Sequence, residues 1–527
     1  MTTSTVAALV IGRLSNHGVD TVFGIPGTHN LELFRAMEEA GIRVVTAHHE
    51  QGLGYAADGY SRVTGKPAVL VVTTGPGVTN VTTALATSLA ASVPVLAIAP
   101  GVPEAAHRGA VGWLHEMPSQ IDHLETLVPS CRALTGDEAL EFIDETFDRW
   151  STRRRTPAYL EIPLDVLESE TTATDTRRSS TKPTLMGQAS MDETAAAAQV
   201  LATAQKPVIV AGRGACGEPE AITLLAERLG APVLTTANAK GLMDEHHPLS
   251  MGVGLRLREG HKLLEAADCV VIVGTDLGPS ETWTPSLPPL GAVIRIDIEP
   301  AQLQKNTPSR YPLQGDAGTI LHRLLDHLAD DRAKKPNWAT AFRRKRWEQI
   351  DAEGEIYKSF HEAISEIFPG DTAIAGDSSQ ATYFGTANYW PATRPNRFLY
   401  PAGYGTLGYA LPAAIGAAVA GATEDVIAVT GEGGFMFSLQ EFATAARMGL
   451  KIPVVVFSNG GFKEIRDGMK SRNIVPTAVD FECPDFVGLA RSLNGEGYTA
   501  ENSEEFRLAL KQAKAANGPT LIHVPLP

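Results

Sequence analysis

Cysteine is scarce in this chain of 527 residues, which has only four: Cys131, Cys216, Cys269 and Cys483. They are too far apart in sequence for a local metal site or a redox pair, and a secreted protein held by disulfides would normally have more. The chain begins Met-Thr-Thr-Ser-Thr and enters an amphipathic pattern at once, without the basic and apolar segments of a signal peptide. We therefore expect a cytoplasmic protein.

Positive charge is also in short supply, because 45 Lys and Arg face 60 Asp and Glu, for a formal net charge of -15. Binding to a phosphate backbone requires a basic face, so we expect no nucleic-acid partner. Residues 67–103 and 401–423 carry no charge at all. Each run is longer than the roughly 20 residues that span a bilayer. Pro and Gly interrupt both, so we interpret them as buried strand–turn–helix units and expect no membrane partner.

The length indicates about three domains, on a prior of roughly 150 residues each. Hydrophobic residues make up 43% of the chain, and 49 Gly and 34 Pro fit an α/β protein with many tight turns. Residues 171–190 are rich in Thr, Ser, Arg and Pro without periodicity, which is typical of a linker. A second, charged linker is expected at 331–353. The predicted domains are therefore residues 1–170, 191–330 and 354–527.

Each predicted domain alternates strand and helix patterns. The predicted strands are residues 21–23, 44–46, 68–72 and 95–99, then 207–211, 232–235, 269–273 and 293–298, then 372–375, 426–430, 453–458 and 520–524. Such alternation predicts an α/β fold of three doubly wound parallel-sheet domains. Ligands are then expected at the carboxyl ends of the strands.

A glycine-rich turn, Gly431-Glu432-Gly433-Gly434, follows one of these strands and can offer backbone amides to a phosphate. Glycines in such a turn more often have a structural role, but Asn459-Gly460-Gly461 follows the next strand. Glu432, the Asn459 amide oxygen and the Gly461 carbonyl could together bind Mg²⁺, leaving positions for two diphosphate oxygens and a water. The spacing of Ser438 and Glu441 predicts a capping box, with a helix from there to Gly449.

Glu50 opens a helical pattern in the first domain. A carboxylate able to protonate an aminopyrimidine, together with a diphosphate and cation site in another domain, is what thiamine diphosphate chemistry requires. Glu50 could instead merely complement a helix N-terminus. The distal motif around Glu432 favours the first interpretation.

These motifs resemble the thiamine diphosphate enzyme superfamily, which includes acetolactate synthase, benzoylformate decarboxylase and pyruvate decarboxylase, and the likeness covers essentially the whole chain. Several segments are similar to the acetolactate-synthase-like subgroup that includes 5-guanidino-2-oxopentanoate decarboxylases: Gly24-Ile25-Pro26-Gly27, His49-Glu50-Gln51, Ala57-Asp58-Gly59-Tyr60, Gly403-Tyr404-Gly405-Thr406-Leu407-Gly408, Ile465-Arg466-Asp467 and Gly112-Trp113-Leu114-His115-Glu116. Acetolactate synthases usually have Gln at the position of His115.

Two positions depart from the pattern of the superfamily. Glu432 stands where its members usually have Asp, and the extra methylene moves the carboxylate about 1.5 Å outward. Because Mg²⁺ requires tight octahedral distances, metal affinity or selectivity is expected to differ. Ser458 replaces the first Asn of the usual Asn-Asn pair, a milder change, since the resemblance assigns the metal ligand to Asn459.

By the resemblance, Glu50 would hydrogen-bond the pyrimidine, the Gly405 carbonyl would hold its amino group, and Leu407 would wedge the two rings into a V. The implied cofactor-contacting residues are Glu50, Thr73, Ser379, Gln380, Gly405, Leu407, Gly433, Gly434, Asn459 and Gly461, and the implied metal ligands are Glu432, Asn459 and Gly461. Two alternatives stay open. Leu407 could be an ordinary core leucine, and Ser379 with Gln380 could cap a helix.

The expected catalytic residues are Glu50, His115 and Thr28. His115 is the candidate proton shuttle, whereas His48 and His49 are expected to be neighbours of Glu50. Thr28 and Thr73 fall where related decarboxylases have Ser or Asp and His, respectively. The proton donor is therefore unassigned.

In the central domain, Gly212-Arg213-Gly214 and Gly274-Thr275-Asp276 resemble nucleotide-binding turns, and acetolactate synthases hold FAD there. The Arg-rich FAD segment of those enzymes is not found around residues 275–288, so we do not expect FAD.

The resemblance implies decarboxylation of a 2-oxo acid to an aldehyde through an enamine, dependent on thiamine diphosphate and Mg²⁺. The alternative is an acetolactate-synthase-type carboligase. A third reading, a cofactor-binding paralogue without turnover, is prompted by Glu432 and the missing histidine at Thr73. The resemblance also implies a homodimer or homotetramer with each active site between subunits.

Overall fold

The computed structural model describes residues 4–107, 111–171, 188–288, 290–328 and 337–527. The chain divides into two compact units. The first comprises residues 1–184, 411–422 and 437–450, and the second comprises 185–410, 423–436 and 451–527. Most of the linker predicted at 171–190, and the start of the one predicted at 331–353, lie outside the described residues. In the described part, no helix is both long enough and apolar enough to cross a membrane.

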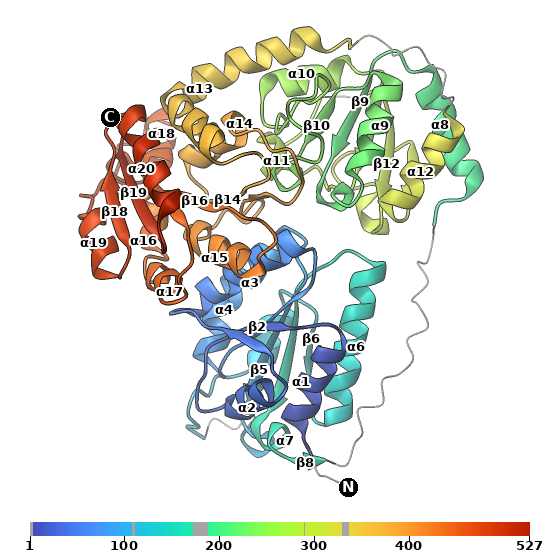
Figure 1. Ribbon diagram of the computed structural model, residues 1–527. Coiled ribbons are helices and arrows are strands. Elements are labelled where there is room, and N and C mark those ends of the chain that lie inside the picture. Colours follow the sequence, from blue (N-terminus) through green and yellow to red (C-terminus); the bar gives the residue numbers. More distant parts are fainter. Residues whose placement is uncertain (1–3, 108–110, 172–187, 289, 329–336) are drawn as a thin grey trace. The chain divides into compact units, whose positions relative to one another are not determined.

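The first unit contains a six-stranded parallel sheet of order β3-β2-β4-β5-β7-β6 (Figure 1). Its strands are β2 (Thr21–Gly24), β3 (Arg43–Val45), β4 (Ala68–Val71), β5 (Val95–Gly101), β6 (Ser130–Arg132) and β7 (Ala158–Pro163). Its helices include α1 (Val6–Asn16), α2 (Leu31–Glu39), α3 (Glu50–Thr64), α4 (Pro76–Ala90), α5 (Gln120–Glu125), α6 (Gly136–Thr152) and α7 (Leu164–Leu167). A small antiparallel pair joins β1 (Ser4–Thr5) to β8 (Glu170–Thr171).

Helix α3 is buried over nearly its whole length, from Gly52 to Val63. It packs against α4 and against α15 (Ala410–Ala420), a helix far away in sequence. Backbones touch at the second contact, because a Cβ atom on Gly416 would lie 1.8 Å from the carbonyl oxygen of Ala56. Small residues at this crossing fix the position of α3. Of the uncharged run 401–423, residues 408–417 are buried, whereas residues 403–405 are exposed.

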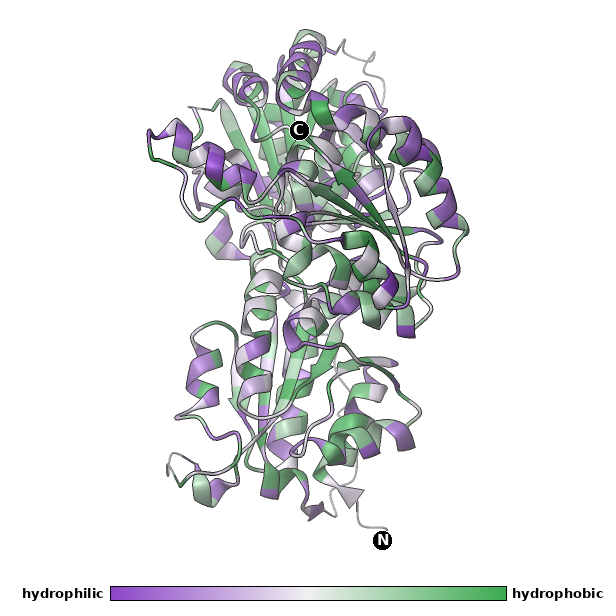
Figure 2. Ribbon diagram, turned by 90° about the vertical axis from the view of Figure 1, so that its left-hand side faces the viewer, coloured by the Kyte–Doolittle hydropathy of each residue, from purple (hydrophilic) through white to green (hydrophobic). Residues whose placement is uncertain are grey.

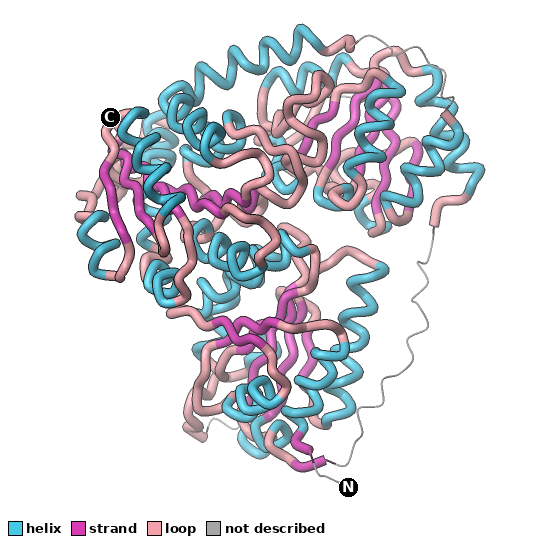
Figure 3. The backbone as a smooth tube through the Cα atoms, in the orientation of Figure 1, coloured by secondary structure: helices cyan, strands magenta, loops and turns pink. Residues whose placement is uncertain are grey.

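The second unit holds two more parallel sheets, in which strands and helices alternate along the chain (Figure 3). The five-stranded sheet has the order β10-β9-β11-β12-β13. Its strands are β9 (Pro207–Ala211), β10 (Val233–Thr235), β11 (Cys269–Val273), β12 (Ala292–Asp297) and β13 (Tyr311–Gln314). Around it lie α8 (Met191–Thr203), α9 (Pro219–Leu229), α10 (Arg258–Ala266), α11 (Pro279–Thr282) and α12 (Ala317–His327).

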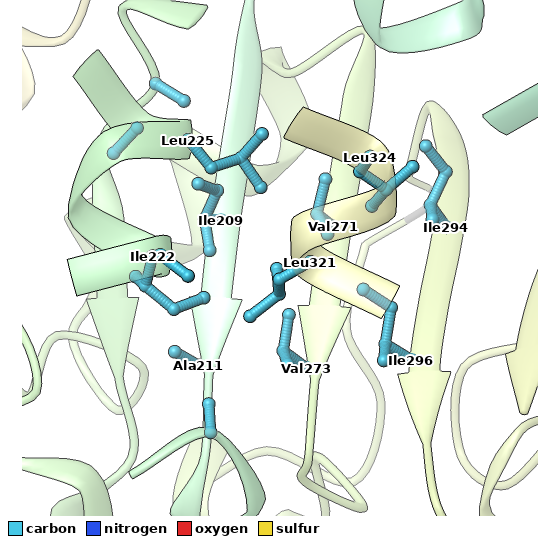
Figure 4. Packing of buried hydrophobic residues seen from close by; sticks show 14 of the residues in the cluster. Ile209, Ala211, Ile222, Leu225, Val271, Val273, Ile294, Ile296, Leu321 and Leu324 are labelled. Carbon is cyan, nitrogen blue, oxygen red and sulfur yellow. The ribbon is translucent and has the colours of Figure 1, made fainter. Parts of the chain in front are cut away.

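One face of this sheet is covered by α9 and α12 (Figure 4). Ile209, Val271 and Ile294 of three neighbouring strands pack against Ile222 and Leu225 of α9 and against Leu321 and Leu324 of α12. Strands of the molecule are mostly hydrophobic along their length (Figure 2). In the five-stranded sheet, alternate residues of β9 and β11 belong to two different core clusters, because helices cover both sides of a parallel sheet.

The six-stranded sheet has the order β15-β14-β16-β17-β19-β18. Its strands are β14 (Ala373–Gly376), β15 (Phe398–Leu399), β16 (Val426–Gly431), β17 (Pro453–Ser458), β18 (Glu496–Thr499) and β19 (Thr520–Pro525). The associated helices are α13 (Thr340–Ile367), α14 (Ala387–Tyr389), α16 (Glu432–Met436), α18 (Lys463–Ser471), α19 (Phe486–Ser492) and α20 (Ser503–Ala515). Helix α13 runs without a break across the boundary predicted at residue 354.

Three parallel-sheet α/β domains are therefore confirmed, but five strands of these sheets were not anticipated, nor was the pair of β1 and β8. Four of them, β6, β13, β15 and β18, lie at sheet edges and are at most four residues long, so they carry little periodic signal. The fifth, β7, lies in the sheet interior.

The predicted capping box at Ser438 is wrong. Helix α16 begins at Glu432 itself, and a separate helix, α17 (Glu441–Arg447), begins at Glu441 with no side-chain cap. The Glu441 carboxylate instead accepts hydrogen bonds from the backbone N–H groups of His48 and His49, at 3.2 and 3.1 Å. A tertiary contact with the start of α3 thus replaces the local cap. Helix α17 ends before Gly449, whose φ of 62° belongs to the left-handed region.

Candidate active site

In the second unit, Glu432, Asn459 and Gly461 come together at the carboxyl ends of the neighbouring strands β16 and β17. Glu432 is only 2% exposed. Its Oε1 accepts hydrogen bonds from the backbone N–H groups of Asn459 (2.9 Å) and Gly461 (2.7 Å). The three residues that the motif spacing predicted to be close together are therefore in contact.

The donor set fits a divalent cation. Within the described residues, the buried Oδ1 of Asn459 has no hydrogen-bond partner. The Gly461 carbonyl accepts one hydrogen bond, from the Lys463 N–H at 3.1 Å, which leaves its second lone pair. A carboxylate, an amide oxygen and a carbonyl are the hard oxygen ligands that Mg²⁺ prefers. No cluster of three or more His, Cys, Asp or Glu suited to a metal occurs in the described part of the chain, as expected for a site with a single carboxylate.

Both glycines after Glu432 are required by close contacts. A Cβ atom on Gly433 would lie 2.5 Å from the Phe462 ring, and one on Gly434 would lie 2.6 Å from a carboxylate oxygen of Asp377. Their structural role is thus clear, and a phosphate-binding role for them stays a prediction.

Asp377 ties several loops of this half-site together. It is 1% exposed and accepts hydrogen bonds from the Thr430 hydroxyl and the Tyr409 N–H, both at 2.7 Å. Burial raises the pKa of Asp377 to about 6, because its effect is larger than that of these hydrogen bonds, which lower the pKa. The side chain connects the end of β14, where it lies, to β16 and to the loop before α15.

Gln380 faces α18, because its Nε2 donates to Glu464 at 2.8 Å and to Asp467 at 3.4 Å. It makes no capping bond to the π-helix that follows at Ala381–Thr386, so the structure does not support the capping alternative for Gln380. The hydroxyl of Ser379 is 3.2 Å from that of Thr382.

Gly405 has a φ of 69°, and its N–H donates to the Pro401 carbonyl at 2.9 Å. Leu407 is only half-buried. The role of Leu407 as a wedge between the rings of the cofactor therefore stays a prediction.

In the first unit, Glu50 is the first residue of α3, and its Oε2 accepts a hydrogen bond from the Asn80 side chain on α4 at 2.9 Å. His49 caps the helix, since its Nδ1 accepts the Gln51 N–H at 3.1 Å. His48 is 2.8 Å from the Thr444 hydroxyl. Glu50 thus lies in the first turn of α3 with its carboxylate held by Asn80, and its role toward the pyrimidine stays a prediction. Asn80 was not anticipated, because only the packing of α3 on α4 brings it to Glu50.

Glu441 is a buried carboxylate near the start of α3, and its place at this site was not anticipated from the sequence. Besides the two N–H groups before α3, it accepts the Thr444 hydroxyl at 2.7 Å, and burial raises its pKa. A Cβ atom on Gly52 would lie 2.7 Å from its Oε1. The Glu441 side chain thus fixes the start of α3, and with it the backbone of Glu50.

Two histidine rings meet at the carboxyl edge of the first sheet. Thr28 is exposed, but the next residue, His29, is 6% exposed and packs edge-on against His115, with ring centroids 5.3 Å apart. Among the described residues, the Nδ1 atoms of both rings and the buried Thr73 hydroxyl lack hydrogen-bond partners. Burial, and then the proximity of His115, lower the pKa of His29. His29 was missed, although its place directly after the turn Gly24-Ile25-Pro26-Gly27 could have indicated it.

The loops that carry these residues touch closely. A Cβ atom on Gly27 would lie 2.8 Å from the Thr73 hydroxyl oxygen, and one on Gly75 would lie 2.3 Å from the His115 carbonyl oxygen. His115 itself has a φ of 63°, in the left-handed region. The first unit therefore assembles His29, Thr73 and His115 at one strand edge.

The glycine turns of the five-stranded sheet contact each other. The Gly214 N–H donates to the Gly274 carbonyl at 3.0 Å, and a Cβ atom on Gly212 would lie 2.4 Å from that of Thr275. The buried Arg295 donates to the Thr275 carbonyl at 2.7 Å. These glycines thus have a packing role, and the expected absence of FAD stays a prediction.

Comparison with known proteins decides the family. Residues 4–126 match the N-terminal TPP binding domain of thiamine pyrophosphate enzymes, residues 194–324 the central domain, and residues 379–524 the C-terminal TPP binding domain. This chain belongs to the thiamine pyrophosphate enzyme family. Glu50 and His115 lie within the first match, and Glu432 and Asn459 within the last.

Relatives of this thiamine pyrophosphate enzyme align over nearly their whole length. A probable 2-ketoarginine decarboxylase of Pseudomonas aeruginosa is 37% identical, covering 99% of this chain and 94% of the relative. An acetolactate synthase of Arthrospira platensis is 30% identical over 99% and 94%. The acetolactate synthase isozyme 2 large subunit of Escherichia coli is 30% identical over 98% and 95%. The resemblance inferred from the motifs is confirmed.

Proposed function

We propose that this thiamine pyrophosphate enzyme decarboxylates a 2-oxo acid to an aldehyde with thiamine diphosphate and Mg²⁺. The observation that carries the proposal is the 37% identity to a probable 2-ketoarginine decarboxylase over 99% of the chain, compared with 30% to the acetolactate synthases. The name of that relative makes 2-ketoarginine, which is 5-guanidino-2-oxopentanoate, the first substrate to test.

In this proposal, Glu432, Asn459 and Gly461 hold Mg²⁺, while Ser379, Gln380, Gly433 and Gly434 contact the diphosphate. The Oδ1 of Asn459, which has no hydrogen-bond partner among the residues that the structure describes, lies beside the buried Glu432 and supports the metal assignment. Gly405, Leu407 and Thr73 contact the rings. When bound, thiamine diphosphate supplies a nucleophilic carbon and a sink for the electrons of the bond to the departing carboxylate.

Glu50 would hydrogen-bond the pyrimidine of the bound cofactor and exchange a proton with it through its carboxylate. The hydrogen bond from Asn80 to its Oε2 holds the carboxylate in place. Glu441 supports this arrangement through the backbone of His48 and His49.

The proton that replaces the lost carboxylate comes from the pair of His29 and His115. Their rings are in contact, and each has a buried Nδ1 without a hydrogen-bond partner in the described part of the chain. A histidine with a lowered pKa donates its proton readily, and its neighbour can restore it. Thr28, which precedes His29 in the chain, assists this proton transfer in the proposal.

Assembly completes the site in this proposal. The domains predicted at 1–170, 191–330 and 354–527 belong to a homodimer or homotetramer, in which each cofactor lies between the first domain of one subunit and the third of another. Each unit exposes apolar side chains beside its half-site, Leu114 at 58% and Ile465 at 54%. Such exposure is typical of surfaces that become covered by a partner.

Carboligation is the second candidate, favoured by the acetolactate synthase relatives. Incubation of the enzyme, loaded with thiamine diphosphate and Mg²⁺, with pyruvate, longer 2-oxo acids and 2-ketoarginine tests both candidates. Release of CO₂ with an equal amount of aldehyde supports decarboxylation. Acetolactate-type products without free aldehyde would establish the carboligase, and no product at all would indicate a paralogue without turnover.

A further inference from the structure

A cavity of about 250 Å³ lies in the second unit, between loops of its two sheets. The five-stranded sheet contributes Arg256, Glu281 and Trp283, and the six-stranded sheet contributes Tyr383, Gly405 and Glu464. Gly405 is one of the residues proposed to hold the cofactor. A ligand in this cavity would therefore lie beside the proposed cofactor site.

The cavity has two carboxylates without a cationic partner. The Oε2 of Glu281 accepts a hydrogen bond from the Thr275 hydroxyl at 2.9 Å, and that of Glu464 accepts one from Gln380 at 2.8 Å. Neither forms an ion pair with Lys, Arg or His of the described residues. Burial, followed by the charge of Asp276, raises the pKa of Glu281 to about 7. A cation nearby would favour its ionised form.

Arg256, a cation in the cavity wall, already forms an ion pair with a residue outside the cavity lining. Its guanidinium pairs with Glu353 at 2.6 Å and donates to the Tyr383 carbonyl at 3.3 Å. It lies 5.1 Å from the ring centroids of both Trp283 and Phe384. The charge of Arg256 is thus balanced by Glu353, and it leaves Glu281 and Glu464 without an ion-pair partner among the described residues.

Carboxylates flanked by aromatic rings are the groups that recognise an organic cation, and a guanidinium in particular. We propose that this cavity binds the cationic end of the substrate's side chain, and that Glu281 and Glu464 determine this specificity. The inference rests on the proposed function, because the 2-oxo group of the substrate must lie at the cofactor near Gly405.

A matched pair of substrates tests the proposal. 5-Guanidino-2-oxopentanoate and 5-ureido-2-oxopentanoate have nearly the same shape, but only the first has a cationic end. We expect the loaded wild-type enzyme to show a kcat/KM at least about tenfold higher for the guanidino compound, as for one charge-assisted hydrogen bond. Glu281→Gln and Glu464→Gln should each remove most of this preference, by lowering kcat/KM for the guanidino compound more than for the ureido compound. Glu496→Gln, an exposed carboxylate outside the cavity lining, is the control and should retain the preference.

Calorimetry with two unreactive acids separates this proposal from the proposed function. 5-Guanidinopentanoate should bind the loaded wild-type enzyme at least about tenfold more tightly than 5-ureidopentanoate, and Glu281→Gln should abolish the difference. If this holds while no 2-oxo acid is decarboxylated, the cavity assignment stands and the proposed function fails. Equal binding of the two acids would overturn the assignment. So would a preference for an acidic substrate such as 2-oxoglutarate, which would assign recognition to Arg256 instead.

Discussion

At the scale of single residues, the metal half-site depends on Glu432, whose Oε1 accepts two backbone N–H groups. Glu432→Ala leaves both donors unpaired, so we expect the metal-free protein to lose about 2 kcal/mol of stability. Calorimetric titration should show that Mg²⁺-dependent binding of thiamine diphosphate is also lost. Glu432→Asp, with the residue usual in the family, is the control and should retain that binding. Unchanged cofactor affinity in the Ala variant would mean that Glu432 is not a metal ligand.

The histidine pair makes a second prediction at this scale. His29→Phe keeps an aromatic ring against His115 but removes both nitrogens. We expect kcat for decarboxylation to fall by about 10²-fold or more, the usual contribution of a proton-transfer group. Cofactor binding, followed by circular dichroism, should not change. His48→Asn, which alters a histidine bonded to Thr444, should have little effect on kcat. A His29→Phe enzyme of normal kcat would remove His29 from the proton path.

At the scale of elements, the crossing of α3 and α15 determines where Glu50 lies. A Cβ atom on Gly416 would lie 1.8 Å from a backbone oxygen of α3, which cannot be relieved by a side-chain movement. We expect Gly416→Ala to lower the free energy of unfolding by about 3 kcal/mol, as for an overpacked core. Gly468→Ala on α18, where nothing lies within 4 Å, is the matched control and should be neutral or slightly stabilising. Equal unfolding midpoints of the two variants in urea would contradict this packing.

Helix α13 supplies a pH-dependent contact. His361 is fully buried, with ring nitrogens 2.9 Å from the Tyr357 carbonyl and the Thr386 hydroxyl, and burial lowers its pKa from 6.5 to about 4. The unfolded chain therefore binds more protons between these values. Stability from His361 is fully present above pH 6.5 and is lost as the pH falls towards 4, by up to about 3 kcal/mol.

Thermal unfolding of wild type and His361→Gln from pH 7 to 4 tests this, and the wild type should lose more stability on acidification. Both proteins contain Asp377, so its contribution to the pH dependence of stability, which has the opposite sign, cancels in the comparison. Because its pKa is raised from 3.8 to about 6, its contribution is present below pH 3.8 and is lost as the pH rises through 6. Parallel curves for the two proteins would show that His361 does not titrate as described.

The same elements show how far the sequence leads. Buried interior strands such as β4, β11 and β16 could be predicted because helices on both faces make them continuously apolar. The Glu432 and Asn459 motifs could be predicted because neighbouring parallel strands end at one sheet edge. The contacts of Glu441 with His48 and of His29 with His115 could not, because these residues are distant in sequence and only tertiary packing brings them together.

At the scale of the whole molecule, the proposed assembly predicts that a monomer has no complete site. Glu50→Gln and Glu432→Ala chains should each be inactive, since each lacks one half of the site. When the two are mixed under conditions of subunit exchange, some hybrid sites combine two intact halves, so we expect roughly a quarter of wild-type activity to return for dimers that exchange at random. No recovery despite proven exchange would mean that each site forms within a single chain.

The most direct test of the account is the stoichiometry of CO₂ and aldehyde released from 5-guanidino-2-oxopentanoate by the enzyme loaded with thiamine diphosphate and Mg²⁺. We predict one aldehyde for each CO₂, and a loss of turnover by at least about 10²-fold in Glu50→Gln, whose amide cannot protonate the pyrimidine. Turnover that persists in Glu50→Gln, or CO₂ released without aldehyde, would contradict the account.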